Sequence, residues 1–457
     1  MRQIIPISNV PTRQPADLVS RLQLPRLYYD KVKMLYRGLE KGGGWTSLNE
    51  KAARESLTTA GINSPDIAMR FGSLPEVMVR IRYENGVDYA GPLSGYRKGY
   101  CEIDNRKILV TRSFHLIKPE RRPWPILKKY LLGLLGKLQL LHLLFWLKVA
   151  YEALTEGIRR PGQALVLAGP ANSGKSFLQH HVITPALGGR SCRCYRYLSG
   201  HTDFNGDLFE AEHLIIDDDV PSANYQNRLA LANSIKSIVA GELQSCHYKY
   251  RDAFTVGPFW RLSISVNDSP ESLLVLPPID ESLEDKLMIF KAQKCPMPMP
   301  TETMVEREAF RKTIYAELPG LLDLITRYPI PPDSDWASRR FAVAHYHHPE
   351  IIQAVHELSA EERLLTLIDT VLFVRHLPLQ LSEPSDLQPW EGTAAELEQK
   401  LTESQTMGRE ARKLLDWNNA CGTYLGRLAK RHPDRIEYRR TTGGKRLWKI
   451  MPACPVQ

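Results

Sequence analysis

Eight residues near the middle of the chain, Gly169 to Ser176, constrain its fold more than any other segment. They read GPANSGKS and fill the pattern G-x-x-x-x-G-K-[ST], in which the backbone N–H groups of a glycine-rich loop surround phosphate oxygens. Such a loop must follow a buried strand and begin a helix. Both neighbours are predicted here, because residues 163–168 form a short apolar run and apolar residues recur at helical spacing from Phe177 onward. The segment therefore predicts an α/β fold with a nucleotide-binding loop.

The loop also assigns roles to its side chains. The Lys175 ammonium is predicted to reach the β- and γ-phosphates, and the Ser176 hydroxyl to lie on Mg²⁺. ATP and Mg²⁺ are thus the predicted cofactors. The predicted nucleotide-binding residues are Gly169, Pro170, Ala171, Asn172, Ser173, Gly174, Lys175 and Ser176.

Three aspartates follow a second apolar run. Residues 212–219 read EHLIIDDD, so a core strand over 214–216 would deliver carboxylates at its carboxyl end, where ligands of parallel sheets bind. We assign Asp217 to the Mg²⁺ water shell and Asp218 to activation of the attacking water. Asp219 is expected to cap the turn before Pro221.

A third apolar run, residues 259–266, ends at Asn267 and Asp268. An amide at a strand end next to the γ-phosphate can hold the attacking water and respond to the presence of that phosphate. Asn-Asp-Ser-Pro by itself is an ordinary turn sequence. Because it comes third in order after the loop and the acids, we predict that Asn267 is a catalytic sensor residue.

Between the acids and Asn267 lies a predicted helix that ends at Gly241, followed by two short strands around Tyr248 to Arg251. These four motifs, in this order, resemble those of superfamily 3 helicases from small DNA viruses, phages and mobile elements. The loop wording is similar to that of papillomavirus initiator helicases and poxvirus-type primase-helicases. The resemblance covers about residues 160–295 and implies an AAA+-like ATPase core that assembles as a ring, a homo-hexamer.

In that family a hairpin grips single-stranded DNA in the central channel. By position the resemblance implies that Lys249 is the gripping lysine, that Tyr250 stands where papillomavirus proteins have histidine, and that Arg251 extends the positive strip. A solvated basic hairpin without DNA contacts is the alternative. The family also completes its site with an arginine from the neighbouring subunit. This chain has Lys286 at the matching position, so either Lys286 or another cation such as Arg261 is expected to serve.

The net charge of +9 is concentrated near the C-terminus. Residues 409–450 hold twelve Lys and Arg against four acids, an excess of +8. Two helices and a turned pair of strands are predicted there, which resembles a winged helix. The resemblance implies duplex DNA contacts from a recognition helix and a wing, with a protein- or RNA-docking module as the alternative. The predicted contact residues are Arg427, Lys430, Arg431, Arg439, Arg440, Lys445 and Arg446.

The 457 residues divide into five predicted regions: an accessory α+β region (1–125), a helical segment (126–160), the ATPase core (161–300), a helical region (301–383) and the winged-helix domain (384–457). Residues 130–150 are very apolar, but polar residues at helical spacing favour a buried helix over a membrane span. Seven scattered cysteines and the visible lack of a signal peptide favour a reduced, cytoplasmic protein. His345, His347 and His348 suggest metal, yet without a neighbouring carboxylate or cysteine pattern a surface loop is the expectation.

The sequence as a whole predicts an ATP-driven DNA helicase that serves replication of a mobile element and binds single-stranded and duplex DNA. A separate primase or polymerase is a further candidate partner. Two alternatives remain open. One is an ATPase switch or loader that does not unwind DNA, and the other is a DNA-binding protein with a structural ATP site.

Overall fold

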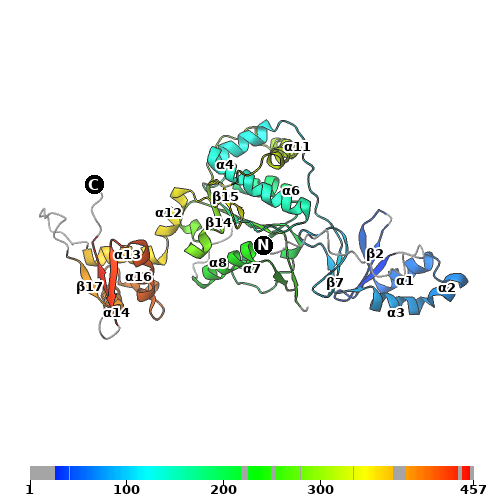
Figure 1. Ribbon diagram of the computed structural model, residues 1–457, viewed down its shortest axis with the longest axis horizontal. Coiled ribbons are helices and arrows are strands. Elements are labelled where there is room, and N and C mark those ends of the chain that lie inside the picture. The colour runs from blue at the N-terminus through cyan, green and yellow to red at the C-terminus, as the bar shows by residue number, and fades with distance from the viewer. Residues whose placement is uncertain are drawn as a thin grey trace. The chain divides into compact units, whose positions relative to one another are not determined.

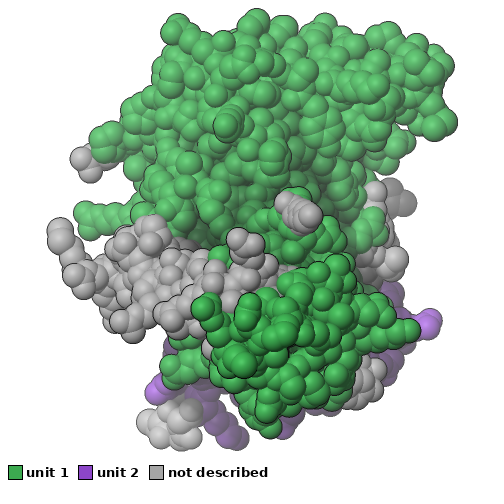
Figure 2. Space-filling model, turned by 90° about the vertical axis from the view of Figure 1, so that its right-hand side faces the viewer, with its two compact units in different colours: residues 1–351 green, residues 352–457 purple. Residues whose placement is uncertain are grey.

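The computed structural model describes residues 26–40, 42–217, 225–248, 253–277, 279–332, 334–373, 388–440 and 445–452. The chain forms two compact units, residues 1–351 and 352–457 (Figure 2). The second unit begins at residue 352 rather than at the predicted residue 384. The reason is that the helix over Ala360–Ile368 contributes its apolar residues to the core of the second unit.

A five-stranded parallel sheet forms the centre of the first unit. Its strand order is β14-β8-β13-β10-β9, and every neighbouring pair is parallel. Three of these strands, β8, β10 and β13, are buried almost throughout, as expected for a sheet covered on both faces. The strands are β8 (Ala164–Ala168), β9 (Ser191–Arg193), β10 (His213–Asp217), β13 (Arg261–Val266) and β14 (Leu287–Lys291).

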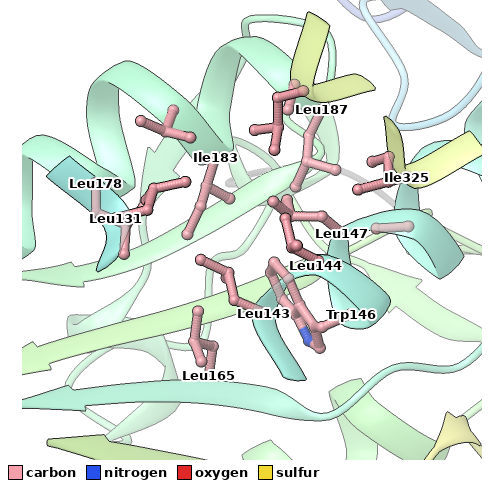
Figure 3. Packing of buried hydrophobic residues seen from close by; sticks show 14 of the residues in the cluster. Leu131, Leu143, Leu144, Trp146, Leu147, Leu165, Leu178, Ile183, Leu187 and Ile325 are labelled. Atoms are coloured by element: carbon pink, nitrogen blue, oxygen red, sulfur yellow. The ribbon is translucent and has the colours of Figure 1, made fainter. Parts of the chain in front are cut away.

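Helix α4 (Pro125–Glu156) runs through the main core of this unit and bends at Gly136, whose backbone is not helical (φ 69°, ψ 176°). Leucines and Trp146 of α4 meet apolar residues from β8, from the segment after the loop, and from helix α11 (Met304–Arg327) (Figure 3). Among the described helices, α4 alone is long and apolar enough to cross a membrane, and 56% of its most apolar stretch is buried in this core.

Apart from α8, the remaining helices of the sheet domain are short. The segment after the glycine-rich loop is helical but changes type, from α5 through the π-helix η2 to α6. The elements are α5 (Lys175–Leu178), η2 (Gln179–Ile183), α6 (Thr184–Ala186), α7 (Tyr195–Leu198), η3 (Leu208–Glu210), α8 (Tyr225–Ala240), α9 (Pro270–Leu273) and α10 (Glu281–Glu284). Two antiparallel pairs complete the domain: β11 (Gln244–Cys246) with β12 (Phe254–Val256), and β15 (Ala337–Ser338) with β16 (Ala342–Val343).

The N-terminal region combines two small sheets with three helices (Figure 1). Its sheets have the orders β3-β2-β1-β4 and β5-β7-β6. The elements are β1 (Leu27–Asp30), β2 (Leu35–Leu39), β3 (Trp45–Leu48), α1 (Glu50–Thr59), α2 (Pro65–Phe71), α3 (Leu74–Glu84), β4 (Gly86–Val87), β5 (Tyr89–Gly91), β6 (Gly99–Ile103) and β7 (Arg106–Val110).

A buried ion pair joins this region to the parallel sheet. The Glu212 carboxylate, fully buried just before β10, accepts hydrogen bonds from the Arg190 guanidinium and from the backbone N–H of Gly95. Arg190 also donates to the carbonyl of Leu93 at 3.1 Å. These bonds fix residues 93–95 of the N-terminal region to the parallel sheet.

The second unit surrounds its own apolar core. It contains a three-stranded antiparallel sheet of order β17-β19-β18, and the chain enters it through the end of α12. Its helix α15 was not predicted from the sequence. The elements are α12 (Pro349–Glu357), α13 (Ala360–Ile368), η4 (Asp369–Phe373), β17 (Trp390–Gly392), α14 (Ala394–Thr402), α15 (Gly408–Leu414), α16 (Ala420–Arg431), β18 (Ile436–Arg440) and β19 (Arg446–Ile450).

Candidate nucleotide site and candidate DNA contacts

The glycine-rich loop connects β8 to α5, as its pattern requires. Gly174 has φ 104°, a conformation that favours glycine, and it immediately precedes the helix. Gly169 is needed for a different reason, because a Cβ there would lie 2.3 Å from the carbonyl oxygen of Ala292. Glycine at these two positions lets the loop turn tightly against the neighbouring strand.

Lys175 lies inside this loop and is only 5% exposed. Its ammonium donates to the carbonyls of Gly169 (2.8 Å) and Pro170 (2.7 Å), and to the side-chain oxygen of Asn267 at 3.3 Å. The positive charge of Lys175 therefore lies where the phosphates would bind, and the ammonium already contacts Asn267, the predicted sensor.

The strand order explains why these motifs meet. β13 lies between β8 and β10, so the loop, Asn267 and Asp217 emerge at the same edge of the sheet. The Ser176 hydroxyl donates to Asp217 at 2.7 Å. A hydroxyl beside a carboxylate is the ligand pair that Mg²⁺ takes in loops of this kind, so the donor set fits the predicted ion.

His180 is a site residue that the sequence reasoning missed. Its Nε2 lies 3.4 Å from Asp217 Oδ2. Hydrogen bonds from His180 and then from Ser176 hold the pKa of Asp217 below its usual value, so the carboxyl is ionised at neutral pH. The signal was available, since His180 follows Ser176 by four residues and such pairs share a helix face.

Tyr130 of α4 also supports the loop. Its hydroxyl donates to the carbonyl of Gly174 at 2.8 Å, and the side chain is fully buried. The ring packs edge-on against Phe177, the residue after Ser176. The sequence separation of more than forty residues left no local signal for this contact.

A cleft of about 590 Å³ lies against the loop. Asn267, Ser265 and the loop residues form its polar side, whereas Phe177, Val275 and Met297 contribute apolar surface. A second hollow of about 480 Å³ shares Phe177 and Met297 with the first. The cleft thus offers polar groups for phosphates and adjoining apolar surface for a planar ring.

The candidate trans cations have different surroundings. Lys286 is 8% exposed and donates to Asp285 (2.7 Å) and to the carbonyl of Ser282. Arg261 is buried at the start of β13, at the sheet edge opposite Asn267, and burial lowers its pKa to about 9. Both cations are largely buried and lie at the amino ends of their parallel strands, so the choice between Lys286 and Arg261 stays a prediction.

Four predicted site residues, Asp218, Lys249, Tyr250 and Arg251, lie outside the described residues, as does Asp219. The strands on either side of the predicted hairpin are described, and β11 pairs with β12 in register from Gln244 opposite Val256 to Cys246 opposite Phe254. Tyr248, which comes just before the gap, has its ring 5.8 Å from that of Tyr89.

In the second unit, the cations of α16 divide into two groups. Arg427 forms an ion pair with the buried Glu361 of α13, and Arg431 lies 3.8 Å from Glu362 of the same helix. Lys430 is exposed on a neighbouring face. The side of α16 that carries Arg427 and Arg431 is thus in contact with α13.

The exposed cations of the predicted wing lie elsewhere. A hollow of about 550 Å³ is bordered by Asn419, Thr423 and Gly426 of α16 and by Lys445 and Arg446. Lys430 continues the same helix face one turn beyond Gly426. The remaining predicted wing residues are exposed on β18, namely Arg439, which lies 3.3 Å from Glu391, and Arg440.

Comparison with known proteins supports the fold. A family model described as a family of unknown function, DUF5906, matches residues 167–281. The apo structure of the NrS-1 C terminal region (305–718) matches with a TM-score of 0.53 and 12% identity, over 96% of this chain and 100% of that one. The A form apo structure of the same region has a TM-score of 0.50 and 13% identity, over 95% and 98%. No curated protein matches.

Two helicase structures are matched more weakly. The match to the JCV helicase covers 53% of this chain and 61% of the helicase chain, with a TM-score of 0.23 and 14% identity. The match to the SCCmec type IV Cch helicase covers 90% of this chain and 74% of the Cch chain, with a TM-score of 0.27 and 10% identity. At these identities the comparisons show the fold alone, and the chain has the fold of the NrS-1 C terminal region.

Proposed function

We propose that the protein is an ATP-dependent DNA helicase of the superfamily 3 type that acts in replication of a mobile element. One observation carries the proposal: the Lys175 ammonium, the Ser176 hydroxyl, the Asp217 carboxylate and the Asn267 amide meet at one edge of the parallel sheet. A phosphate loop, an acid and a sensor at this edge are what hydrolysis of a nucleoside triphosphate requires.

The residues divide the chemistry between binding and hydrolysis. The loop N–H groups and Lys175 hold the phosphates, while Ser176 and Asp217 hold Mg²⁺, which neutralises phosphate charge when bound. Asn267, hydrogen-bonded to Lys175, orients water next to the γ-phosphate, and Asp218 accepts a proton from that water. We assign the nucleotide base to the apolar surface of Phe177 and Met297, which both hollows share.

DNA contacts are assigned to two places. Lys249, Tyr250 and Arg251 grip a single strand from the hairpin that β11 and β12 support. The order of strands and helices in the second unit, β17-α14-α15-α16-β18-β19, supports a winged helix that binds duplex DNA. Within it, Lys430, Lys445 and Arg446 border or continue one hollow and are the preferred phosphate contacts.

Assembly into a homo-hexamer would bring a cation to the γ-phosphate of the next subunit. Lys286 remains our candidate, because it stands at the end of α10 before the edge strand β14. Its pairing with Asp285 means that it must exchange partners to do so.

The proposal is tested with two variants of the full chain. Lys175→Ala removes the phosphate cation and should abolish ATP hydrolysis while duplex DNA binding persists. Lys249→Ala should keep basal hydrolysis but lose stimulation by single-stranded DNA and lose strand displacement on a forked substrate. Full hydrolysis in Lys175→Ala contradicts the ATPase, and normal unwinding by Lys249→Ala contradicts the helicase mechanism.

The main alternative is an ATPase switch that loads DNA or a partner without unwinding. It predicts ATP turnover that responds to DNA but gives no displaced strand in the wild-type protein. A helicase and a switch are therefore separated by the same fork assay, run with wild-type protein and with ATP omitted as the control.

A further inference from the structure

A second cluster of chemically active side chains lies away from the nucleotide cleft. Ligand atoms of Glu284, His345 and His347 all lie within 4.8 Å of one another. The sequence separates them by about sixty residues, and the histidines were expected to form a surface loop because no carboxylate stood near them. The fold supplies that carboxylate from the end of α10.

The backbone explains how the two histidines come to share a face. Residues 345–348 run beside the edge strand β14, where the N–H of Ile289 donates to the Tyr346 carbonyl (2.7 Å) and the N–H of His348 donates back to the Ile289 carbonyl (2.8 Å). Side chains alternate along such an extended segment, so His345 and His347 point to one side and Tyr346 to the other.

Tyr346 anchors the segment on its inner side. Its ring centroid lies 4.8 Å from that of His142 in α4 and 5.9 Å from that of Phe290 in β14. The outward histidines are thereby held near each other, with ring centroids 5.1 Å apart. This segment is therefore a fixed part of the sheet edge and not a loose surface loop.

We propose that Glu284, His345 and His347 form a binding site for a divalent transition metal ion, with Zn²⁺ as the best match. Two imidazoles and one carboxylate are a common zinc ligand set, and they leave a fourth position for water or for a group from another molecule. Bond lengths of 2.0–2.2 Å place ligand atoms about 3.3 Å apart in a tetrahedral site. Rotation of the exposed Glu284 and His345 side chains can close the difference of about 1.5 Å.

One further observation favours ligation. The Nε2 atom of His347 is buried and has no hydrogen-bond partner among the described residues. A buried ring nitrogen normally has a bonding partner, and a bound metal ion would supply one here.

The ion would join two parts of the chain. Glu284 lies two residues before Lys286, and His347 lies four residues before the end of the first unit at Ile351. Metal binding would therefore fix the α10–β14 connection against the segment that leads into the second unit. This role is separate from the Mg²⁺ expected at Ser176 and Asp217, because Mg²⁺ prefers oxygen ligands.

Metal binding is tested on the full chain after removal of metals with a chelator. Free thiols are alkylated first, because the cysteines could bind zinc themselves. Titration with Zn²⁺ in a calorimeter, in excess Mg²⁺, should then show one site per chain. Binding of Co²⁺ should give the visible absorption of a tetrahedral ion with nitrogen and oxygen ligands.

Three variants decide the outcome. Glu284→Gln and His345→Asn should each weaken Zn²⁺ binding by at least about tenfold, the loss that follows even when only a supporting group of a metal site is removed. His348→Asn is the matched control, since it neighbours the cluster but its side chain is not a proposed ligand. Absence of a zinc site in the wild type, unchanged affinity in both ligand variants, or equal loss in His348→Asn would each overturn the proposal.

Discussion

The contact between Asn267 and Lys175 yields the sharpest prediction about the nucleotide site. The amide oxygen lies 3.3 Å from the ammonium, which is 5% exposed. Asn267→Ala removes one hydrogen bond to a charged group, worth about 1.5–3 kcal/mol. Lys175 keeps the carbonyls of Gly169 and Pro170, so the ammonium stays in place and we expect ATP affinity to fall by no more than about tenfold, the low end of that range.

Asn267→Asp instead introduces a negative charge beside the Lys175 ammonium. At 3.3 Å and an effective dielectric constant of about 20, a new carboxylate attracts the Lys175 ammonium with about 5 kcal/mol. This attraction competes with the phosphates, and the carboxylate also repels them. We therefore expect ATP binding to weaken by at least about 100-fold, well beyond the loss in Asn267→Ala.

The assay separates binding from turnover. ATP affinity is measured by fluorescence titration, and kcat is measured at saturating ATP, with Asp268→Asn as the matched control. Loss of the water-orienting amide in Asn267→Ala should lower kcat by at least about 100-fold, beyond its effect on affinity. If kcat stays within about threefold of the wild type, or if Asn267→Asp binds ATP as well as Asn267→Ala, the sensor role is refuted.

Three further predictions concern stability. Arg190→Met removes both guanidinium bonds to the buried Glu212 carboxylate and should lower the free energy of unfolding by about 3 kcal/mol in urea titrations, with partial recovery when Glu212 is also replaced by Met. Burial lowers the pKa of His213 to about 3, below the value of about 6.5 in the unfolded chain. The contribution of His213 to the free energy of unfolding is therefore complete above about pH 6.5 and falls by about 1.4 kcal/mol per pH unit as the pH drops towards 3. His213→Gln should flatten this pH dependence. Arg427→Ala leaves the buried Glu361 unpaired and should cost about 1–2 kcal/mol, because the arginine is half exposed; a variant as stable as the wild type would contradict this.

The central α/β core could be predicted because its signals are local. The loop, the apolar run before Asp217 and the run before Asn267 each specify a strand and the group at its end within about ten residues. Parallel strands then bring their carboxyl ends to one edge without further information. The three central strands β8, β13 and β10 and the residues at their ends follow from these local patterns, whereas the edge strands β9 and β14 were not predicted.

The missed contacts depend on pairings between distant segments. Tyr130 reaches Gly174 only because α4 packs across the loop, and Glu284 reaches His345 only because residues 345–348 pair with β14. No spacing within either segment predicts its partner. The apolar stretch of α4 is a contrasting case, because the polar residues within it favoured a buried helix and 56% of its most apolar part is buried in the core.

The C-terminal segment illustrates that the net charge counted along a sequence differs from the charge that the folded surface exposes. The excess of +8 over residues 409–450 leaves out the acids of α13 and η4, which bind Arg427, Arg431 and Arg435 through Glu361, Glu362 and Asp369. Cations engaged in this way contribute less to phosphate binding than exposed ones.

A measurable consequence follows for duplex DNA. Each phosphate that a cation neutralises contributes about −0.9 to the slope of log affinity against log salt concentration. Seven predicted DNA contacts would therefore give a slope of about −6, whereas the five cations that do not pair with α13 would give about −4.5. The five are Lys430, Arg439, Arg440, Lys445 and Arg446. Salt titrations of wild type and Lys430→Ala by fluorescence anisotropy should show the slope shrink by about 0.9 in the variant. A wild-type slope near −6, or an unchanged slope in Lys430→Ala, would mean that DNA displaces α13 from α16 or that Lys430 lies outside the interface.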